Sequence, residues 1–105
     1  MSIIDEILNK TVSGADNSDT LNIENSPGFS IHAVVGAGLT ATLKLQGSNT
    51  GSNFVDIAGT TESISGSAID FLWDMDNQYY EYVRLNFSSV TGSGTAVVTS
   101  KKKRP

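Results

Sequence analysis

The chain has 105 residues, a formal net charge of -4, 10 glycines and no cysteine. Its length is that of one domain with a single modest core, which excludes a two-domain organisation. The acidic balance argues against a general nucleic-acid-binding surface, and the lack of cysteine excludes disulfides and thiolate chemistry.

The first segment, 1–12, has the pattern of a short helix or arm. Ser2 can cap a helix, and Asp5 follows three residues later, as in a capping box. Apolar residues then recur at helical spacing and would form one stripe. The residues of this stripe are Ile3, Ile4, Ile7 and Leu8. Because two helical turns are unstable alone, we expect the stripe either to cover an open end of its own domain or to anchor a partner or second subunit.

No targeting signal is visible in this segment. The pair Asp5 and Glu6 stands where a secretory signal peptide carries basic residues. Nowhere in the chain is there a run of about 20 apolar residues, the length that spans a membrane. We therefore expect the protein to be made and folded in a cytoplasm, with no membrane partner.

The segment 13–100 is expected to be the folded domain. Residues 13–19 have a loop composition, and the segments after them alternate apolar and polar side chains with a period of two, which is typical of half-buried antiparallel strands. The predicted strands are Thr20–Glu24, Phe29–Val35, Thr40–Gln46, Phe54–Ala58, Glu62–Ser65, Ala68–Asp74, Tyr80–Ser88 and Thr95–Thr99. About eight strands at this spacing predict an all-β antiparallel sandwich, of the jelly-roll or the immunoglobulin-like type.

Turn-forming residues separate these strands. Gly36-Ala37-Gly38 is predicted to form a hairpin turn between the second and third strands. Inside the domain, the alternation places Val55 and Ile57 on the apolar face of their strand. Trp73 shares a face with Ile69 and Phe71, so we expect it to anchor the core rather than to serve as an exposed sugar platform.

The last five residues, 101–105, form a basic tail. Lys101, Lys102, Lys103 and Arg104 are four of the seven basic residues of the chain. A charge run of this kind is usually solvated. The alternative is a contact with an acidic neighbour, and nucleic acid is expected as a partner only through this tail.

The residues that could carry chemistry do not form a catalytic pattern. His32 is the only histidine, and it alternates with Ile31 and Ala33, so we expect it on the solvent face without a nucleophile beside it. Two clusters have oxygens that could bind Ca²⁺, but neither continues into a complete calcium loop, and turn formation explains both. These clusters are Asp16-Asn17-Asp19 and Asp74-Asp76-Asn77. We expect no enzyme activity, no metal and no cofactor.

Three residues near the start of the strand 80–88 are candidates for a protein interface. Tyr80, Tyr82 and Arg84 alternate with the apolar residues Val83 and Leu85, so we expect them on the outer face. Tyrosine and arginine are enriched at protein–protein interfaces, although outward tyrosines also stabilise sheets through cross-strand pairs.

Four stretches in this order resemble a group of small β-sandwich proteins of tailed phages. They are Leu45-Gln46-Gly47-Ser48-Asn49-Thr50-Gly51-Ser52-Asn53-Phe54-Val55-Asp56-Ile57, Phe71-Leu72-Trp73-Asp74, Tyr82-Val83-Arg84-Leu85 and Gly92-Ser93-Gly94-Thr95. The similarity spans residues 21–99. The chain departs from the group at Thr50, where an acidic residue is common, and at Phe54, where tryptophan is common.

The resemblance implies a non-enzymatic virion structural protein, such as a capsid decoration, head-fibre or tail-associated component. Its partners would be capsid or tail proteins of the same virion, and it would act as a homo-oligomer made in the cytoplasm of a bacterial host. The expected interface residues are Ile3, Ile4, Ile7, Leu8, Tyr80, Tyr82, Arg84, Lys101, Lys102, Lys103 and Arg104. Two alternatives remain: a carbohydrate-binding module that uses the 47–53 and 74–78 turns with Trp73 or Tyr82, and a protein of a prophage remnant.

Overall fold

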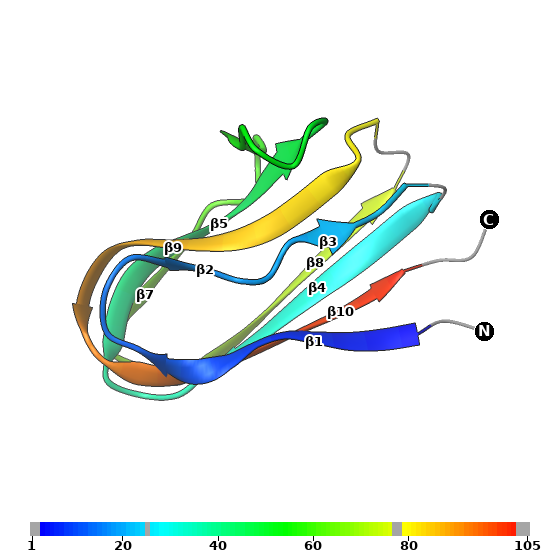
Figure 1. Ribbon diagram of the computed structural model, residues 1–105. Coiled ribbons are helices and arrows are strands. Elements are labelled where there is room, and N and C mark those ends of the chain that lie inside the picture. The colour runs from blue at the N-terminus through cyan, green and yellow to red at the C-terminus, as the bar shows by residue number, and fades with distance from the viewer. Residues whose placement is uncertain (1–2, 25, 77–78, 103–105) are drawn as a thin grey trace.

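The computed structural model describes residues 3–24, 26–76 and 79–102, and all regular structure within them is β-strand (Figure 1). The strands form two antiparallel sheets that pack face to face. One sheet has four strands in the order β1 (Ile3–Val12), β10 (Gly94–Lys102), β4 (Gly28–Val35) and β8 (Ile69–Asp76). None of the described residues belongs to a helix that could cross a membrane.

The second sheet has six strands, and at each of its two edges two short strands follow one another along the same neighbouring strand. The main path is β2 (Asp16–Asn17), β9 (Tyr82–Gly92), β5 (Leu39–Ser48) and β6 (Val55–Asp56). β3 (Leu21–Asn22) continues the β2 edge along β9, and β7 (Glu62–Ser65) continues the β6 edge along β5. Each sheet therefore has four strand positions.

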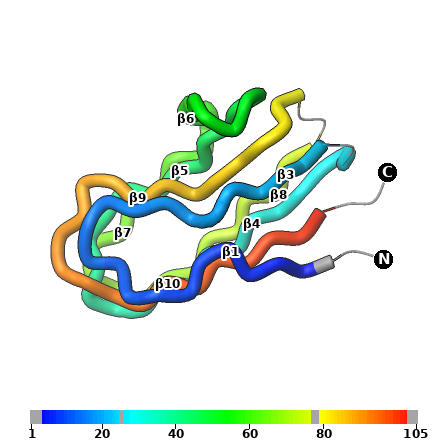
Figure 2. The backbone as a smooth tube through the Cα atoms, in the orientation of Figure 1, coloured from blue at the N-terminus to red at the C-terminus, as the bar shows by residue number. Residues whose placement is uncertain are grey.

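Most connections cross from one sheet to the other, which decides between the two predicted sandwich types. β1 leads to β2, β4 to β5, β7 to β8 and β9 to β10, and each of these steps changes sheet. The crossing strands occupy matching positions in the two sheets, as Figure 2 shows along the chain. This double Greek-key order is that of a jelly roll.

The crossing also corrects the expected hairpin at Gly36-Ala37-Gly38, because β4 and β5 lie in different sheets. This connection is one of several arches at the closed end of the sandwich (Figure 1). The arches bond to each other: the Gly38 N–H donates to the Gly66 oxygen at 2.9 Å, and the Ser93 N–H donates to the Gly38 oxygen at 3.2 Å. Gly38 has a φ of 107°, and a Cβ there would lie 2.6 Å from the Ser93 oxygen. Only glycine fits this position without strain.

The expected helix at the N-terminus is wrong, because residues 3–12 form the edge strand β1. β1 pairs along its whole length with β10, from Ile3 opposite Lys102 to Val12 opposite Gly94. The register shifts between Glu6 and Leu8, where the extra residue of a β-bulge, Ile7, is inserted. Ile7 is buried and Leu8 packs against the core. Because of the bulge, the adjacent residues Ile7 and Leu8 both face the core, which breaks the period of two expected of a strand. The resulting apolar spacing is the one that led to the prediction of a helix.

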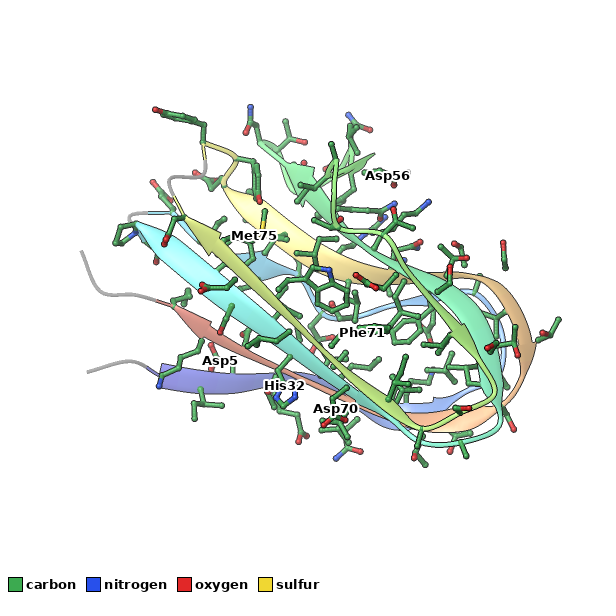
Figure 3. All side chains as sticks on the ribbon, turned by 180° about the vertical axis from the view of Figure 1, so that it is seen from behind. Asp5, His32, Asp56, Asp70, Phe71 and Met75 are labelled. Carbon is green, nitrogen blue, oxygen red and sulfur yellow. The ribbon has the colours of Figure 1, made fainter. Side chains whose placement is uncertain are left out.

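The core lies between the two inner sheet faces, as the alternation predicted for most strands. The four-stranded sheet contributes buried side chains of β4, among them Phe29, Ile31 and Val35. They face buried side chains of β5 and β9 in the other sheet, which include Leu43, Leu45, Val83, Leu85 and Phe87. Trp73 is 7% exposed, and its indole N–H donates to the Thr60 oxygen at 2.8 Å, which confirms its role as a core anchor. In Figure 3, Phe71 and Met75 of β8 lie between the sheets.

Val55 is the exception to the alternation. It is 70% exposed, whereas Ile57 packs against the core as expected. Val55 pairs with Gly47 at the edge of the six-stranded sheet, where it lines an open pocket. The prediction that Val55 faces the core is therefore wrong, because the opposite sheet does not cover this corner.

Candidate functional site

The predicted N-terminal stripe does not form a common surface. Ile4 is 68% exposed, whereas Ile7 is 5% exposed and belongs to the core. Leu8 is half-buried and packs against the core. The strand alternation and the bulge separate these side chains, so Ile4 alone of the three points to solvent. The structure describes the backbone of Ile3 but not its side chain.

The predicted basic tail is in part a strand. Lys101 and Lys102 belong to β10, where Lys101 is exposed and Lys102 is half-buried. The Lys102 Nζ donates to the backbone oxygen of Asn22 at 3.2 Å and so joins the two sheets at the end that carries both termini. Lys103 and Arg104 lie outside the described residues. The prediction of a free tail beginning at 101 is therefore wrong for its first two residues.

Tyr80 does not lie on the outer face with Tyr82 and Arg84, because β9 begins only at Tyr82. Its ring packs edge-on against Phe29, with centroids 6.4 Å apart. A Cβ added at Gly47 would lie 3.1 Å from this ring, so the glycine allows the close approach. The Tyr80 hydroxyl is buried and has no hydrogen-bond partner among the residues that the structure describes, and burial raises the Tyr80 pKa to about 12. The expectation of an exposed Tyr80 is wrong.

Tyr82 and Arg84 do lie on the outer face of the six-stranded sheet, where both are half-buried. The Tyr82 ring lies over the loop 48–53, and a Cβ at Gly51 would be 3.5 Å from it. The Tyr82 pKa is raised, chiefly because its hydroxyl is hydrogen-bonded to the side chain of Glu81 and lies near the charge of that carboxylate. Of the three residues predicted to lie on the outer face, Tyr82 and Arg84 therefore do so.

Arg84 begins a chain of polar contacts that runs across β9, β5 and β6. Its Nε donates to the Gln46 Oε1 at 2.9 Å, and its guanidinium carbon lies 4.1 Å from the centre of the Phe54 ring. The Gln46 Nε2 donates to the Asp56 Oδ1 at 2.9 Å. The Lys44 Nζ lies 3.0 Å from the Asp56 Oδ2. These contacts hold the Arg84 side chain in one orientation.

The hydrogen bond from Gln46 lowers the pKa of Asp56, and Lys44 lowers it further. Asp56 is therefore charged at neutral pH, and the Lys44 ammonium balances it. We call the surface formed by Tyr82, Arg84, Gln46, Phe54, Asp56 and Lys44 the outer-face network. Because the charges of Lys44 and Asp56 balance each other, the network as a whole carries the positive charge of Arg84.

The loop 48–53 beside this network is ordered by its own hydroxyls. The Ser48 Oγ accepts the N–H groups of Thr50 at 3.1 Å and Gly51 at 3.0 Å. The Thr50 Oγ1 accepts the N–H groups of Ser52 at 3.2 Å and Asn53 at 3.4 Å. Two successive hydroxyl-capped turns therefore fix the loop and leave its asparagine side chains free for other contacts.

An open pocket of about 410 Å³ lies between this loop, β6 and Tyr80. Its lining combines polar loop residues with apolar residues. The lining residues are Gly47, Ser48, Asn49, Asn53, Val55, Asp56, Ile57 and Tyr80. The volume falls within the roughly 300–1,000 Å³ range of small-molecule sites.

Among the described residues, none of those considered for metal or acid–base chemistry lines this pocket. His32 lies exposed on the outer face of the four-stranded sheet (Figure 3), opposite Thr99 and Leu72 in the register. Asp16 forms an ion pair with Lys10 at 2.6 Å, and Asn17 accepts a hydrogen bond from Asn86. Over the described ranges, no three histidine or carboxylate side chains gather as a metal site would require. Asn77 of the second oxygen cluster lies outside these ranges.

Sequence reasoning did not connect Gln46, Phe54 and Asp56 with Arg84. The alternation could show that Gln46 and Arg84 are polar outward positions, but their pairing depends on the register of β5 against β9. The sequence pattern also does not predict the pocket, because Tyr80 is distant in sequence from the loop with which it forms the pocket.

The comparisons with known proteins bear on the fold. No protein-family model matches the chain, and no curated protein matches it in sequence. Among solved structures, the fold is similar to that of the SPBc2 prophage-derived protein YomS, with a TM-score of 0.63 and 12% sequence identity. The match covers 96% of this chain and 93% of that protein. At this identity the similarity establishes a shared fold over almost the whole chain.

Proposed function

We propose that this chain is a non-enzymatic structural protein of a bacteriophage virion that binds capsid or tail proteins. The observation that carries the proposal is the end-to-end fold similarity to a prophage-derived protein. The four sequence stretches that resemble tailed-phage β-sandwich proteins support it independently, and jelly rolls are frequent in viral capsid proteins. The protein would be made in the bacterial cytoplasm and end in the particle.

The proposed contact surface is the outer-face network. Tyr82, Phe54 and Arg84 are residue types that dominate binding energy at protein interfaces. Because Gln46 and Phe54 already orient Arg84, a partner would not have to order that side chain, so the entropic cost of binding is lower.

A second contact region is proposed at the N-terminal end of β1. Ile4 is exposed and lies opposite Lys101 in the register, so an apolar and a basic side chain are neighbours there. With Lys103 and Arg104, they would suit an acidic surface with an apolar centre. A homo-oligomer would bring several copies of either region together and strengthen attachment.

Quantitative peptide mass spectrometry of density-purified particles from the source lysate tests the role. We expect a stoichiometric signal relative to the major capsid protein. A copy number near that of the capsid subunit would indicate head decoration, and a few to about a dozen copies would indicate the neck, tail or fibre. Absence from the particles would overturn the virion role.

The surface is tested with the variants Arg84→Ala and Lys10→Ala. Arg84 belongs to the outer-face network, whereas Lys10 pairs with Asp16, and neither of these two residues is part of the network. We expect Arg84→Ala to reduce incorporation into particles at least tenfold, while Lys10→Ala incorporates normally. Equal incorporation of both folded variants would exclude the outer-face network as the contact surface.

A further inference from the structure

The pocket beside Tyr80 is preformed. The hydroxyls of Ser48 and Thr50 fix the loop on one side through four backbone N–H groups. On the other side, the Thr60 Oγ1 donates to the Ile57 oxygen at 2.7 Å, and the Ile57 N–H donates to the Leu45 oxygen at 2.9 Å. A ligand would therefore bind without ordering the walls, which favours affinity.

The floor of the pocket is apolar although it faces solvent. Val55 is 70% exposed, and Ile57 and Tyr80 add partly buried apolar surface. Val55, Ile57 and Tyr80 therefore give the pocket an apolar surface that the C–H groups of a small ring compound could contact.

The rim has unused hydrogen-bonding groups. The side-chain amides of Asn49 and Asn53 are exposed, and the structure gives them no hydrogen-bond partner within the described residues. Each amide offers donors and an acceptor at once.

The charge of the lining selects against ionic ligands. Asp56 is the one ionised residue in the lining, and the Lys44 ammonium lies 3.0 Å from its carboxylate. The lining contains no lysine, arginine or histidine, so a phosphate or carboxylate would find no cation among these residues. A cation would find one carboxylate that is already paired.

We propose that this pocket binds a neutral saccharide. A pyranose ring has an apolar C–H face for Val55 and Tyr80, and hydroxyls that both donate and accept hydrogen bonds for Asn49 and Asn53. The site keeps the 47–53 turn of the expected carbohydrate-binding module. It uses Val55 and Tyr80 in place of Trp73, which is buried in the core, and Tyr82, which is not part of the lining. On a virion, such a pocket would add a weak contact with host-surface glycans.

The test is a titration of the ¹⁵N-labelled protein, followed by amide chemical shifts, with glucose, galactose, N-acetylglucosamine and their neutral disaccharides. We expect at least one sugar to bind with a Kd of about 1 mM, because the pocket is open and offers few polar contacts. The shift changes should be confined to residues 47–57 and the backbone near Tyr80. Shift changes elsewhere, or none with any of these sugars, would overturn the proposal.

Matched variants locate the binding groups. The double variant Asn49→Ala/Asn53→Ala should weaken binding at least tenfold, whereas Asn17→Ala, an exposed asparagine on the same sheet outside the pocket, should leave it unchanged. Equal affinity in the double variant, or tighter binding of sialic acid or glucuronic acid than of neutral sugars, would contradict the site or its class. Both results are independent of particle mass spectrometry.

Discussion

At the residue scale, Tyr80 shows how one side chain can leave the pattern of its neighbours. The alternation along the strand predicts an outward-facing Tyr80, but Tyr80 precedes β9. Its ring turns to Phe29 of the opposite sheet and closes one end of the core. This gains apolar burial and leaves the hydroxyl without a partner.

Removing that hydroxyl should stabilise the free protein. Tyr80→Phe deletes a buried polar group that gains no hydrogen bond, so the free energy of unfolding should rise by about 1 kcal/mol. For a domain of this size the melting temperature would rise by roughly 4–8 °C. Thermal and urea unfolding measure the change. Tyr79→Phe is the control, because Tyr79 is 98% exposed; a loss of stability in Tyr80→Phe would show that the hydroxyl does have a partner.

The ion pairs make a second prediction at this scale. The hydrogen bond from Lys10 lowers the Asp16 pKa below its ordinary value of 3.8. A lowered pKa contributes stability that is complete above pH 3.8 and is lost as the pH falls through the folded pKa. Lys10→Ala should therefore raise the Asp16 pKa towards 3.8 and leave the lowered pKa of Asp56 unchanged. Carboxyl ¹³C titration by NMR measures both, and an unmoved Asp16 midpoint would refute the pairing in solution.

At the element scale, β1 shows how a bulge disguises a strand. Ile7 and Leu8 are adjacent and both contact the core, because the register against β10 shifts between Glu6 and Leu8. A strict period of two would have been recognisable as a strand. The segment is also rich in β-branched isoleucine, which favours a strand once a partner edge is present.

The position of β1 predicts that truncating Ile7 and truncating Ile4 change the free energy of unfolding by different amounts. Ile7→Ala should lower the free energy of unfolding by about 2–5 kcal/mol, because a buried side chain is truncated. Ile4→Ala should change it by less than about 0.5 kcal/mol, because Ile4 is exposed. Urea unfolding compares the two. Similar small effects for both would favour a detachable arm over a docked edge strand.

At the scale of the whole molecule, the jelly roll joins the two ends of the chain. Ile3 of β1 lies opposite Lys102 of β10, and the closed-end arches bind to each other. Neither sheet can form completely without strands from both halves of the sequence. We therefore expect a single cooperative unit that folds slowly, as non-local β topologies do.

This cooperativity is testable with Trp73, the one tryptophan of the chain. Its side chain is buried beside Phe71, so its fluorescence reports on the core, whereas far-ultraviolet circular dichroism reports on the strands. The two probes should give the same urea midpoint and the same slope. Separate midpoints would mean that one sheet or edge unfolds on its own.

The sequence by itself determined the fold class and most of the inward faces. The alternation of Ile31 with His32, or of Leu85 with Arg84, is a local property that any strand displays wherever it pairs. Trp73 was recognisable as a core residue for the same reason. Only the tertiary structure decided which sheet each strand joins, and therefore that Gly36–Gly38 is an arch, that β1 is an edge strand and that Tyr80 adjoins the loop at Asn49 and Asn53. Pairing and register depend on contacts between distant segments, and no local periodicity encodes which strand is the partner.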